Sequence, residues 1–469
     1  MANILQTEPN HWKYVSEGGA TIVFSYCGPS HPDFDGTVLR LRKSIVTAVS
    51  SGKTKSQKDL DALTDGDEPD DPTIEYQVRC MERLIPQEYL PRLRTVMLDR
   101  SWLESLVQLQ DSSRPEDRRE KDEVDLDRKK GVLATDLVGG NWLAVEIKVM
   151  KPAGLNVQLK PKWAFLPSPR HLSEETKSVK TQTCRFCMQT HLRAHKGQQI
   201  VTNYCPLDLF SGDEGRIIKA ICSLWDGWVA SDATANNLKI FARGKFVTPS
   251  EAKLMLKNDA CAGVELNAIR DAFAITLLRP LFQTPILHII SRLQRTLDVL
   301  DIEGLSKLWR ETESSAPLYR TTFAPFFKQK DPASQSIPPS TPIGVSSLFL
   351  QAPEPDISDW INFLDNYLSP DKSKLDHSNP SPENLREYLM AYLLSATFKD
   401  CSIIIKLDFL DLLNPPEEDT SDSVTIIDLD PKSMKKLKSW EKLDQEIAIT
   451  YATSTQQKKI CIDQWQHSK

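Results

Sequence analysis

The stretch of sequence that decides the fold is Leu143-Ala-Val-Glu-Ile-Lys148, followed by Lys160-Pro-Lys-Trp-Ala-Phe-Leu-Pro167. Side chains alternate between the two faces of a strand, so the first segment predicts a strand with apolar residues on one face and a Glu and a Lys on the other. Burying these charges is costly unless the charged face meets a ligand. Lysines also flank the proline of the second segment, which favours extended backbone. Clustered lysines on a rigid element therefore predict a polyanion site.

Composition makes that site a local feature of an ordinary globular protein. The 469 residues are enough for two sizeable cores, with 40% of them hydrophobic and 26% charged. A net charge of −6 argues against a protein that coats nucleic acid, because such proteins carry a basic field. Residues 1–14 lack an apolar core and no apolar run is long enough to span a bilayer, so we expect neither a secretory signal nor a membrane span. The nine cysteines are then expected as reduced thiols, in the nucleus or the cytoplasm.

Strand patterns dominate the first part of the chain and helix patterns the rest. Paired strands are expected at 12–15, 21–26 and 38–42, with a turn at Glu17-Gly-Gly-Ala20. Polar or Pro- and Ser-rich connections are expected at 51–72, 334–356 and 370–382. Helical spacing predicts helices at 76–84, 102–109, 286–300 and 385–394, and a further helix after a capping box at Ser211-Gly-Asp-Glu214.

Two short β-branched runs carry candidate acids. The first is Lys399-Asp-Cys-Ser-Ile-Ile-Ile-Lys406, and the second is Ser423-Val-Thr-Ile-Ile-Asp-Leu-Asp430. If the runs pair as an antiparallel hairpin, Asp400 and Asp428 lie at the same end, and Asp428 shares a strand face with Asp430. One acid then suits a proton acceptor and the other a Mg²⁺ ligand, the groups that kinase-like phosphoryl transfer uses. Spacing alone favours a plain strand end.

Ligand types for zinc gather between residues 171 and 205. Cys184 and Cys187 form a CxxC pair, His191 follows four residues later, and His171 and Cys205 lie nearby. This spacing suits a structural Zn²⁺, and the alternative is two reduced core thiols. The expected zinc ligands are His171, Cys184, Cys187 and His191.

Three further features carry weaker signals. The glycine turn lets backbone amides approach phosphates but is more often an ordinary hairpin, and no P-loop, Gly-rich kinase loop or HRD signature occurs. Asn237 and Lys239 share a strand face, which supplies an amide and a cation. A lysine run at 432–438 is typical of a solvated face, although it directly follows the candidate Mg²⁺ ligands.

Together these segments resemble the inositol-pentakisphosphate 2-kinase family, and the lengths of the polar insertions are typical of its fungal members. The matching pieces occur in the family's order. They are Glu17-Gly-Gly-Ala20, Arg114-Pro-Glu-Asp-Arg118, Glu146-Ile-Lys148 with Pro161-Lys162, Cys184-Arg-Phe-Cys-Met188, Cys205-Pro-Leu-Asp-Leu-Phe-Ser-Gly212, Asn236-Asn237, Lys399-Asp-Cys-Ser402 and Asp428-Leu-Asp430. The run at 205–212 is long and specific, whereas the glycine turn is not.

The resemblance implies an α+β, two-lobed, protein-kinase-like fold of the inositol-phosphate-kinase type, with an ATP cleft between the lobes. A strand-rich N-lobe would cover 1–140, and a C-lobe with the inositide site, the zinc site and the catalytic acids would cover 141–469. The implied activity is ATP-dependent phosphorylation of inositol 1,3,4,5,6-pentakisphosphate at the 2-hydroxyl, which gives inositol hexakisphosphate (phytate). We expect a monomer with no direct nucleic-acid binding and no membrane span.

The resemblance also implies roles for individual residues. Asp400 would be the base that receives the 2-hydroxyl proton, and Asp428, assisted by Asp430, would bind Mg²⁺. The nucleotide would be held by Gly18, Gly19, Ala20, Arg40, Asp136 and Glu146. The substrate phosphates would be contacted by Arg118, Lys148, Lys162, Arg193, Asn236, Asn237, Lys239, Lys432, Lys436 and Trp440. A ligand with five phosphates needs many cations, and its charge offsets the repulsion among clustered lysines.

One departure from the family lies in the opening stretch. The family has Glu-Ile-Lys-Pro-Lys without a break, whereas residues 149–160 separate Lys148 from Pro161 here. The insert is either a genuine loop or an intron translated in error. A strand continued through it would keep the lysines on one face, and if it loops out, either Lys148 or Lys160 pairs with Lys162.

Two rivals to an active kinase come from other functional classes. One is a catalytically impaired scaffold that binds inositides with the same fold, and the acids Asp400, Asp428 and Glu146 favour the enzyme over it. The other is a zinc-dependent nucleic-acid module, which the acidic net charge and the single CxxC pair disfavour.

Overall fold

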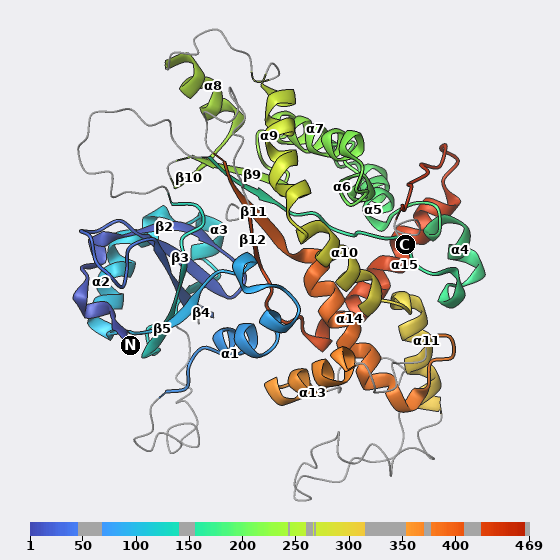
Figure 1. Cartoon of the computed structure of the whole chain (residues 1–469), viewed down its shortest axis with the longest axis horizontal. Helices are drawn as coiled ribbons and strands as arrows, with labels where there is room; N and C mark the ends of the chain where they lie inside the picture. Colours follow the sequence, from blue (N-terminus) through green and yellow to red (C-terminus); the bar gives the residue numbers. More distant parts are fainter. Residues whose placement is uncertain are drawn as a thin grey trace, which may run out of the picture. The chain divides into compact units, whose positions relative to one another are not determined.

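The computed structural model describes residues 1–45, 68–139, 155–242, 244–258, 266, 269–314, 353–369, 377–407 and 424–464. They form a mixed α+β structure with two sheets and many helices, which confirms the predicted fold class at that level (Figure 1). The chain divides into two compact units, one made of residues 1–156, 240–247 and 408–410, and the other of the remaining residues. The division into lobes at residue 140 stays a prediction.

The first sheet has seven strands, all within the first unit. They are β1 (Ala2–Asn3), β2 (Trp12–Glu17), β3 (Thr21–Tyr26), β4 (Thr37–Ile45), β5 (Leu93–Met97), β6 (Asp122–Val124) and β7 (Lys130–Thr135). The order is β1-β5-β7-β4-β3-β2, and β6 pairs with β4. The predicted strand pair around the glycine turn is confirmed, because β2 and β3 pair antiparallel from Trp12–Tyr26 to Glu17–Ile22.

Three helices accompany this sheet, namely α1 (Pro72–Arg79), α2 (Arg100–Gln110) and α3 (Glu116–Arg119). Asp99 caps α2 by accepting a hydrogen bond from the Trp102 N–H. Trp102 then packs against Trp12 in a core whose other members include Ile22, Phe24 and Leu39. The first unit therefore has an apolar core of its own.

A buried ion network fixes the end of β2, directly before the glycine turn. Glu17 pairs with Lys43 of β4 and with Arg114, whose guanidinium nitrogen lies 3.0 Å from the carboxylate. Lys43 and Arg114 both also pair with Asp122, each at 2.8 Å. Only 3% of the Glu17, Lys43 and Arg114 side chains is exposed. Burial favours a protonated Glu17, but Arg114 and Lys43 outweigh this effect and lower its pKa.

We expect Arg114→Met to destabilise the protein by about 3–5 kcal/mol, because it leaves buried carboxylates without one of their partners. The free energy of unfolding in urea measures the loss. The matched control is Arg100→Met, since Arg100 also pairs with two carboxylates but keeps 61% of its side chain exposed. The control should lose less than about 1 kcal/mol. Equal losses in the two variants would contradict the role of the network.

The second sheet has five strands in the order β10-β9-β8-β11-β12. They are β8 (Leu155–Leu159), β9 (Leu238–Ala242), β10 (Lys245–Val247), β11 (Ser402–Leu407) and β12 (Val424–Ile427). The predicted strand at 143–148 lies outside the described residues. Within the insert, however, residues 155–159 form β8, so this part of the insert continues into a sheet and does not loop out.

Helices make up most of the second unit. They are α4 (Glu174–Lys180), α5 (Arg185–His195), α6 (Pro206–Leu209), α7 (Glu214–Ala230), α8 (Pro249–Asn258), α9 (Arg270–Gln283), α10 (Ile286–Leu297), α11 (Asp301–Ser314), α13 (Ile357–Leu368), α14 (Leu385–Asp400) and α15 (Leu437–Thr453). The long buried helix α14 lies beside α10 (Figure 1). The expected capping box before α7 is wrong, because Asp213 is the N-cap and accepts from the Arg216 N–H at 2.8 Å.

Within the described residues, no single helix has both the length and the apolar composition to cross a membrane. One bent pair, α9 followed by 286–312, meets these two criteria jointly.

Candidate functional site

The two candidate acids lie at the same end of a β-hairpin, as the sequence predicted. Asp400 is the last residue of α14, and β11 begins two residues later at Ser402. β11 and β12 pair antiparallel, with Ser402 opposite Ile427, so Asp428 directly follows the paired residues. Asp428 does not share a strand face with Asp430, because β12 ends at Ile427 and Asp428 has φ 64°.

Three lysines hold the two carboxylates. Lys162 Nζ lies 3.3 Å from one oxygen of Asp400, and Lys432 Nζ lies 3.0 Å from the other. Lys160 Nζ lies 3.4 Å from Asp428 Oδ2. Partial burial raises the pKa of Asp400, but Lys432, Lys162 and Lys160 outweigh it and lower the value to about 2. Asp400 is therefore ionised at neutral pH and keeps half of its side chain exposed.

Two residues of this site, one after β8 and one after β12, have a strained backbone. Lys162 has φ 67° and Asp428 has φ 64°, a left-handed conformation that costs a non-glycine residue about 1–3 kcal/mol. Such residues persist only where their surroundings fix them, and they gather at functional sites. The strain turns the backbone at the two positions whose side chains meet Asp400 and Lys160.

Strand β8 places the lysines, because Lys160 immediately follows its last residue. The Lys160 N–H donates to the Asn237 carbonyl, and the Asn237 side-chain amide donates to the Lys160 carbonyl at 3.3 Å. Lys239 lies on β9 beside this segment. Its pKa is lowered by burial and then by the charge of Lys160, and Asp428 only partly offsets these effects. Crowded cations of this kind favour an anionic ligand.

Two polar residues beside the acids were missed by the sequence analysis. Ser402 Oγ donates to Asp428 Oδ2 at 2.6 Å, and Gln158 of β8 donates to Ser402 Oγ at 2.9 Å. The signal for both was present. Ser402 ends the family-like Lys399-Asp-Cys-Ser402 run, and Gln158-Leu-Lys-Pro-Lys162 aligns without a break with Glu-Ile-Lys-Pro-Lys, with Gln for Glu and Leu for Ile.

Lys160 is thus placed beside Asp428, and the choice between Lys148 and Lys160 as the partner of Lys162 stays open. Lys148 and Glu146 both lie outside the described residues, and their predicted roles stay predictions.

The remaining predicted substrate residues are scattered over several elements. Arg118 is half-buried on α3 of the first unit, Arg193 is exposed near the end of α5, and Asn236 is exposed before β9. Lys436 is exposed at the start of α15. The Trp440 ring lies 6.2 Å from that of Tyr392, which is packed in α14. Asp430 is exposed, and its carbonyl accepts from Thr397 at 3.3 Å.

The predicted nucleotide residues that are described belong to the first unit. The turn of Gly18, Gly19 and Ala20 is closed by a hydrogen bond from the Gly18 N–H to the Thr21 carbonyl. A Cβ added to either glycine would meet nothing within 4 Å, so this space beside the turn is open. Arg40 lies on β4, between β3 and β7. Asp136 is buried after β7, and its carboxylate accepts from Ser25 and from the Val138 and Gly139 N–H groups.

Four buried thiols converge elsewhere in the second unit. Cys184, Cys187, Cys205 and Cys461 place their sulfur atoms within 4.8 Å of one another. Cys184 and Cys205 are 3.9 Å apart, close to the spacing of about 3.8 Å expected between thiolates bound tetrahedrally to one zinc ion. The thiols hydrogen-bond one another, which raises the pKa of Cys184 and lowers the pKa of Cys461.

The thiol cluster contains two of the four predicted zinc ligands. Cys184 and Cys187 belong to the cluster, but His171 hydrogen-bonds the His377 carbonyl at 2.8 Å, and the His191 ring packs edge-on against Tyr451. The physical reason is that the fold brings two distant thiols next to the CxxC pair, which completes a set of four without histidine. Cys205 had been noted nearby in the sequence, whereas Cys461 gave no signal.

Comparison with known proteins gives one family. The profile of the family described as inositol-pentakisphosphate 2-kinase matches residues 14–446. The chain is 30% identical to the inositol-pentakisphosphate 2-kinase of Cryptococcus neoformans var. neoformans serotype D, over 94% of this chain and 93% of that one. It is 26% identical to a rice (Oryza sativa subsp. japonica) protein of that name, over 94% and 93%. For the Danio rerio protein the identity is 30%, over 59% of this chain and 50% of that one. The chain belongs to the inositol-pentakisphosphate 2-kinase family.

Proposed function

We propose that this protein transfers the γ-phosphoryl group of ATP to the 2-hydroxyl of inositol 1,3,4,5,6-pentakisphosphate, which yields inositol hexakisphosphate. The observation that carries the proposal is the pair Asp400 and Asp428 at one hairpin end, contacted by Lys160, Lys162 and Lys432. A pure inositide scaffold has use for the lysines but not for the two acids. Membership of the family supports the same reaction.

In this proposal Asp400 is the base that accepts the proton of the 2-hydroxyl group. It is ionised and half exposed, as a proton acceptor must be, and Lys162 and Lys432 fix both of its oxygens. Asp428 would hold Mg²⁺, because an exposed carboxylate is the ligand type that this ion prefers. Bound Mg²⁺ would supply charge neutralisation on the transferred phosphoryl group.

The substrate phosphates would meet the same lysines together with Lys239 and Asn237. The nucleotide would be held by the glycine turn, Arg40, Asp136 and Glu146 of a two-lobed kinase-like fold with an ATP cleft. The eight described cysteines form no disulfide with one another, which fits a reducing compartment, the nucleus or the cytoplasm.

The direct test incubates the purified protein with Mg²⁺, ATP and inositol 1,3,4,5,6-pentakisphosphate and separates the products by anion exchange. We expect inositol hexakisphosphate and ADP in equal amounts. Binding of the pentakisphosphate without any product at micromolar enzyme would instead support the scaffold.

We also propose that one structural zinc ion is bound by Cys184, Cys187, Cys205 and Cys461. Four buried thiols within 4.8 Å are a closed set of the kind found in structural zinc sites. The ion would connect α5 to the segments before α6 and after α15, which lie far apart along the chain.

Protein purified without added zinc should contain about one zinc ion per chain. We expect Cys461→Ser to lower the zinc content and the melting temperature, because a structural site needs all four ligands. His191→Ala should retain the zinc. If His191→Ala loses the zinc and Cys461→Ser keeps it, the result would contradict the four-cysteine site and support the ligands predicted from the sequence. Elemental analysis of the variants separates the two results.

A further inference from the structure

The buried side-chain amide of Gln294 hydrogen-bonds to the two backbone segments that carry Asp400 and Lys162. Gln294 of α10 has no exposed surface. Its Oε1 accepts from the Ala164 N–H at 2.9 Å, and its Nε2 donates to the Lys162 carbonyl at 2.9 Å. The same Nε2 donates to the Phe398 carbonyl at 3.0 Å, two residues before Asp400. One side chain therefore binds the backbone on both sides of Trp163 and near the end of α14.

A second polar residue, the C-cap of α10 four positions after Gln294, contacts the same region. Asp298 pairs with Lys399, and both are almost fully buried. The Lys399 ammonium also lies 4.0 Å from the centroid of the Trp163 ring. Lys399 directly precedes Asp400, and Trp163 directly follows Lys162. Lys399 and Trp163, the neighbours of Asp400 and Lys162, therefore contact each other, and Lys399 also pairs with the C-cap of α10.

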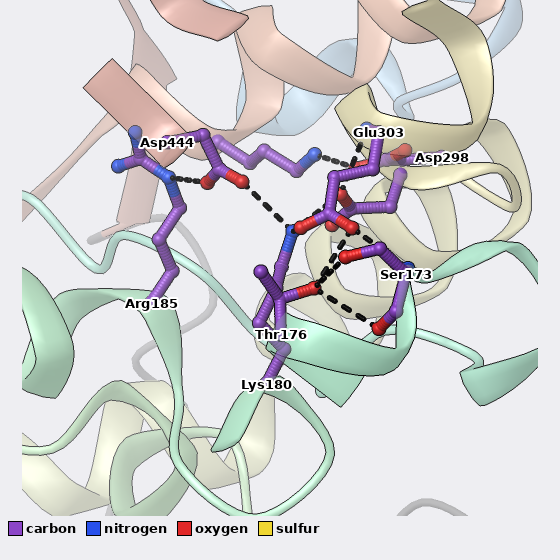
Figure 2. Close-up of polar contacts among 9 residues, drawn as sticks. Ser173, Thr176, Lys180, Arg185, Asp298, Glu303 and Asp444 are labelled. Carbon is purple, nitrogen blue, oxygen red and sulfur yellow. Dashed lines mark hydrogen bonds and ion pairs between the residues drawn. The ribbon is translucent and has the colours of Figure 1, made fainter. Parts of the chain in front are cut away.

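Beyond Trp163 the contacts continue into a charged core. The Arg185 guanidinium lies 4.9 Å from the Trp163 ring and 2.8 Å from Asp444. In Figure 2 the Lys180 ammonium lies between Asp444, at 2.8 Å, and Glu303, at 3.0 Å. Residues of α4, α5, α11 and α15 therefore form an ion-paired network behind Trp163, which reaches the Trp163 ring through Arg185, while Gln294 binds the backbone on either side of Trp163.

The hydrogen bonds of Gln294 stabilise the strained backbone of Lys162. Its left-handed backbone costs about 1–3 kcal/mol and persists only where neighbours fix it. Gln294 supplies this constraint, since it binds the Lys162 carbonyl and the Ala164 N–H together. Replacing the amide would remove the partner of the Lys162 carbonyl and of the Ala164 N–H, each at a cost of about 1–3 kcal/mol, whereas the Phe398 carbonyl keeps a hydrogen bond from the Cys401 thiol at 3.2 Å.

We propose that Gln294 is a positioning residue for the phosphoryl transfer: its amide sets where Lys162 stands relative to Asp400. The inference rests on the proposed function, because it takes Asp400 as the base. It assigns a role to a residue that touches neither substrate nor nucleotide. Displacements of about 1 Å at a reacting group are enough to lower a rate 10²-fold.

The test compares Gln294→Met, which keeps the volume and loses the amide, with Ser395→Ala. Ser395 is the matched control, because its buried hydroxyl donates to the Gln294 backbone carbonyl at 2.9 Å and not to the side chain. Steady-state kinetics from pH 7 to pH 5 and melting temperatures are measured for both full-length variants. If Gln294→Met does not fold, Gln294→Glu replaces it, since the acid keeps the acceptor for the Ala164 N–H and changes only the donor end.

We expect the kcat of the Gln294 variant to fall about 10²-fold, with a much smaller change in KM for ATP. Its activity relative to wild type should fall further as the pH is lowered, because Lys162 no longer holds Asp400 ionised as firmly. Ser395→Ala should lose stability alone, with a pH-independent activity ratio. Equal kcat and equal pH dependence in the Gln294 and Ser395 variants would overturn the positioning role.

Asp400→Asn in the same series separates this inference from the proposed function. An active Asp400→Asn enzyme would overturn the base assignment and the positioning role that rests on it. An inactive Asp400→Asn enzyme with an unaffected Gln294 variant would overturn the positioning role alone.

Discussion

Asp400→Asn should lower kcat by about 10²–10⁴-fold and leave binding of inositol pentakisphosphate intact or tighter. The loss reflects the removal of the group that accepts the 2-hydroxyl proton, for which general-base catalysis contributes rate factors of this size. Binding survives because the amide has the shape of the carboxylate and because Lys162 and Lys432 lose a negative neighbour that competes with substrate phosphates. Single-turnover kinetics measure the rate, and calorimetry with the pentakisphosphate measures the affinity.

The matched control for this variant is Asp226→Asn. Asp226 is an exposed acid of α7 that pairs with Arg270 at 3.4 Å, outside the hairpin that carries the acids. It should keep wild-type kcat. A kcat within about threefold of wild type for Asp400→Asn, far below the factor that a catalytic base contributes, would remove Asp400 from the role of base.

Lys432→Met should weaken substrate binding and make the activity more sensitive to acid. A hydrogen bond to a charged group contributes about 1.5–3 kcal/mol, so Kd for the pentakisphosphate should rise roughly 10–150-fold. The pH effect follows from the charges around Asp400. Lys432 lowers the pKa of Asp400 more than any other cation, so its removal raises that pKa from about 2. The carboxylate is then protonated at a higher pH, and the ratio of variant to wild-type kcat/KM falls as the pH drops from 7 to 5.

The control here is Lys435→Met, an exposed lysine of the same run. Its pH profile should follow that of wild type, and its affinity for substrate should change little. Using the ratio of kcat/KM values cancels the titration of the substrate phosphates, which is the same for all variants. A flat ratio for Lys432→Met would show that Lys432 does not hold Asp400 ionised.

Several local predictions were accurate because neighbouring residues specify them. The glycine turn and its flanking strands were predicted from the alternation of apolar and polar residues on either side of a short glycine-containing turn. β2 and β3 indeed pair there. The acid hairpin follows from two β-branched runs, and β11 and β12 pair as expected. The long helices at 286–297 and 385–400 follow from apolar spacing. The predicted strand face shared by Asp428 and Asp430 was wrong, because the left-handed backbone of Asp428 ends the strand and with it the alternation of side chains.

The sequence by itself determined the family, the strands around the glycine turn and the acid pair, because these depend on motifs and on contacts between nearby runs. Only the tertiary structure placed Lys160 beside Asp428, at the end of a strand, β8, that lies within the insert. It also brought Cys205 and Cys461 together with Cys184 and Cys187, and it brought Gln294 to Lys162 and Phe398. The physical reason is shared: each of these contacts joins residues distant in the chain, whose proximity depends on how helices and strands pack and not on any local period.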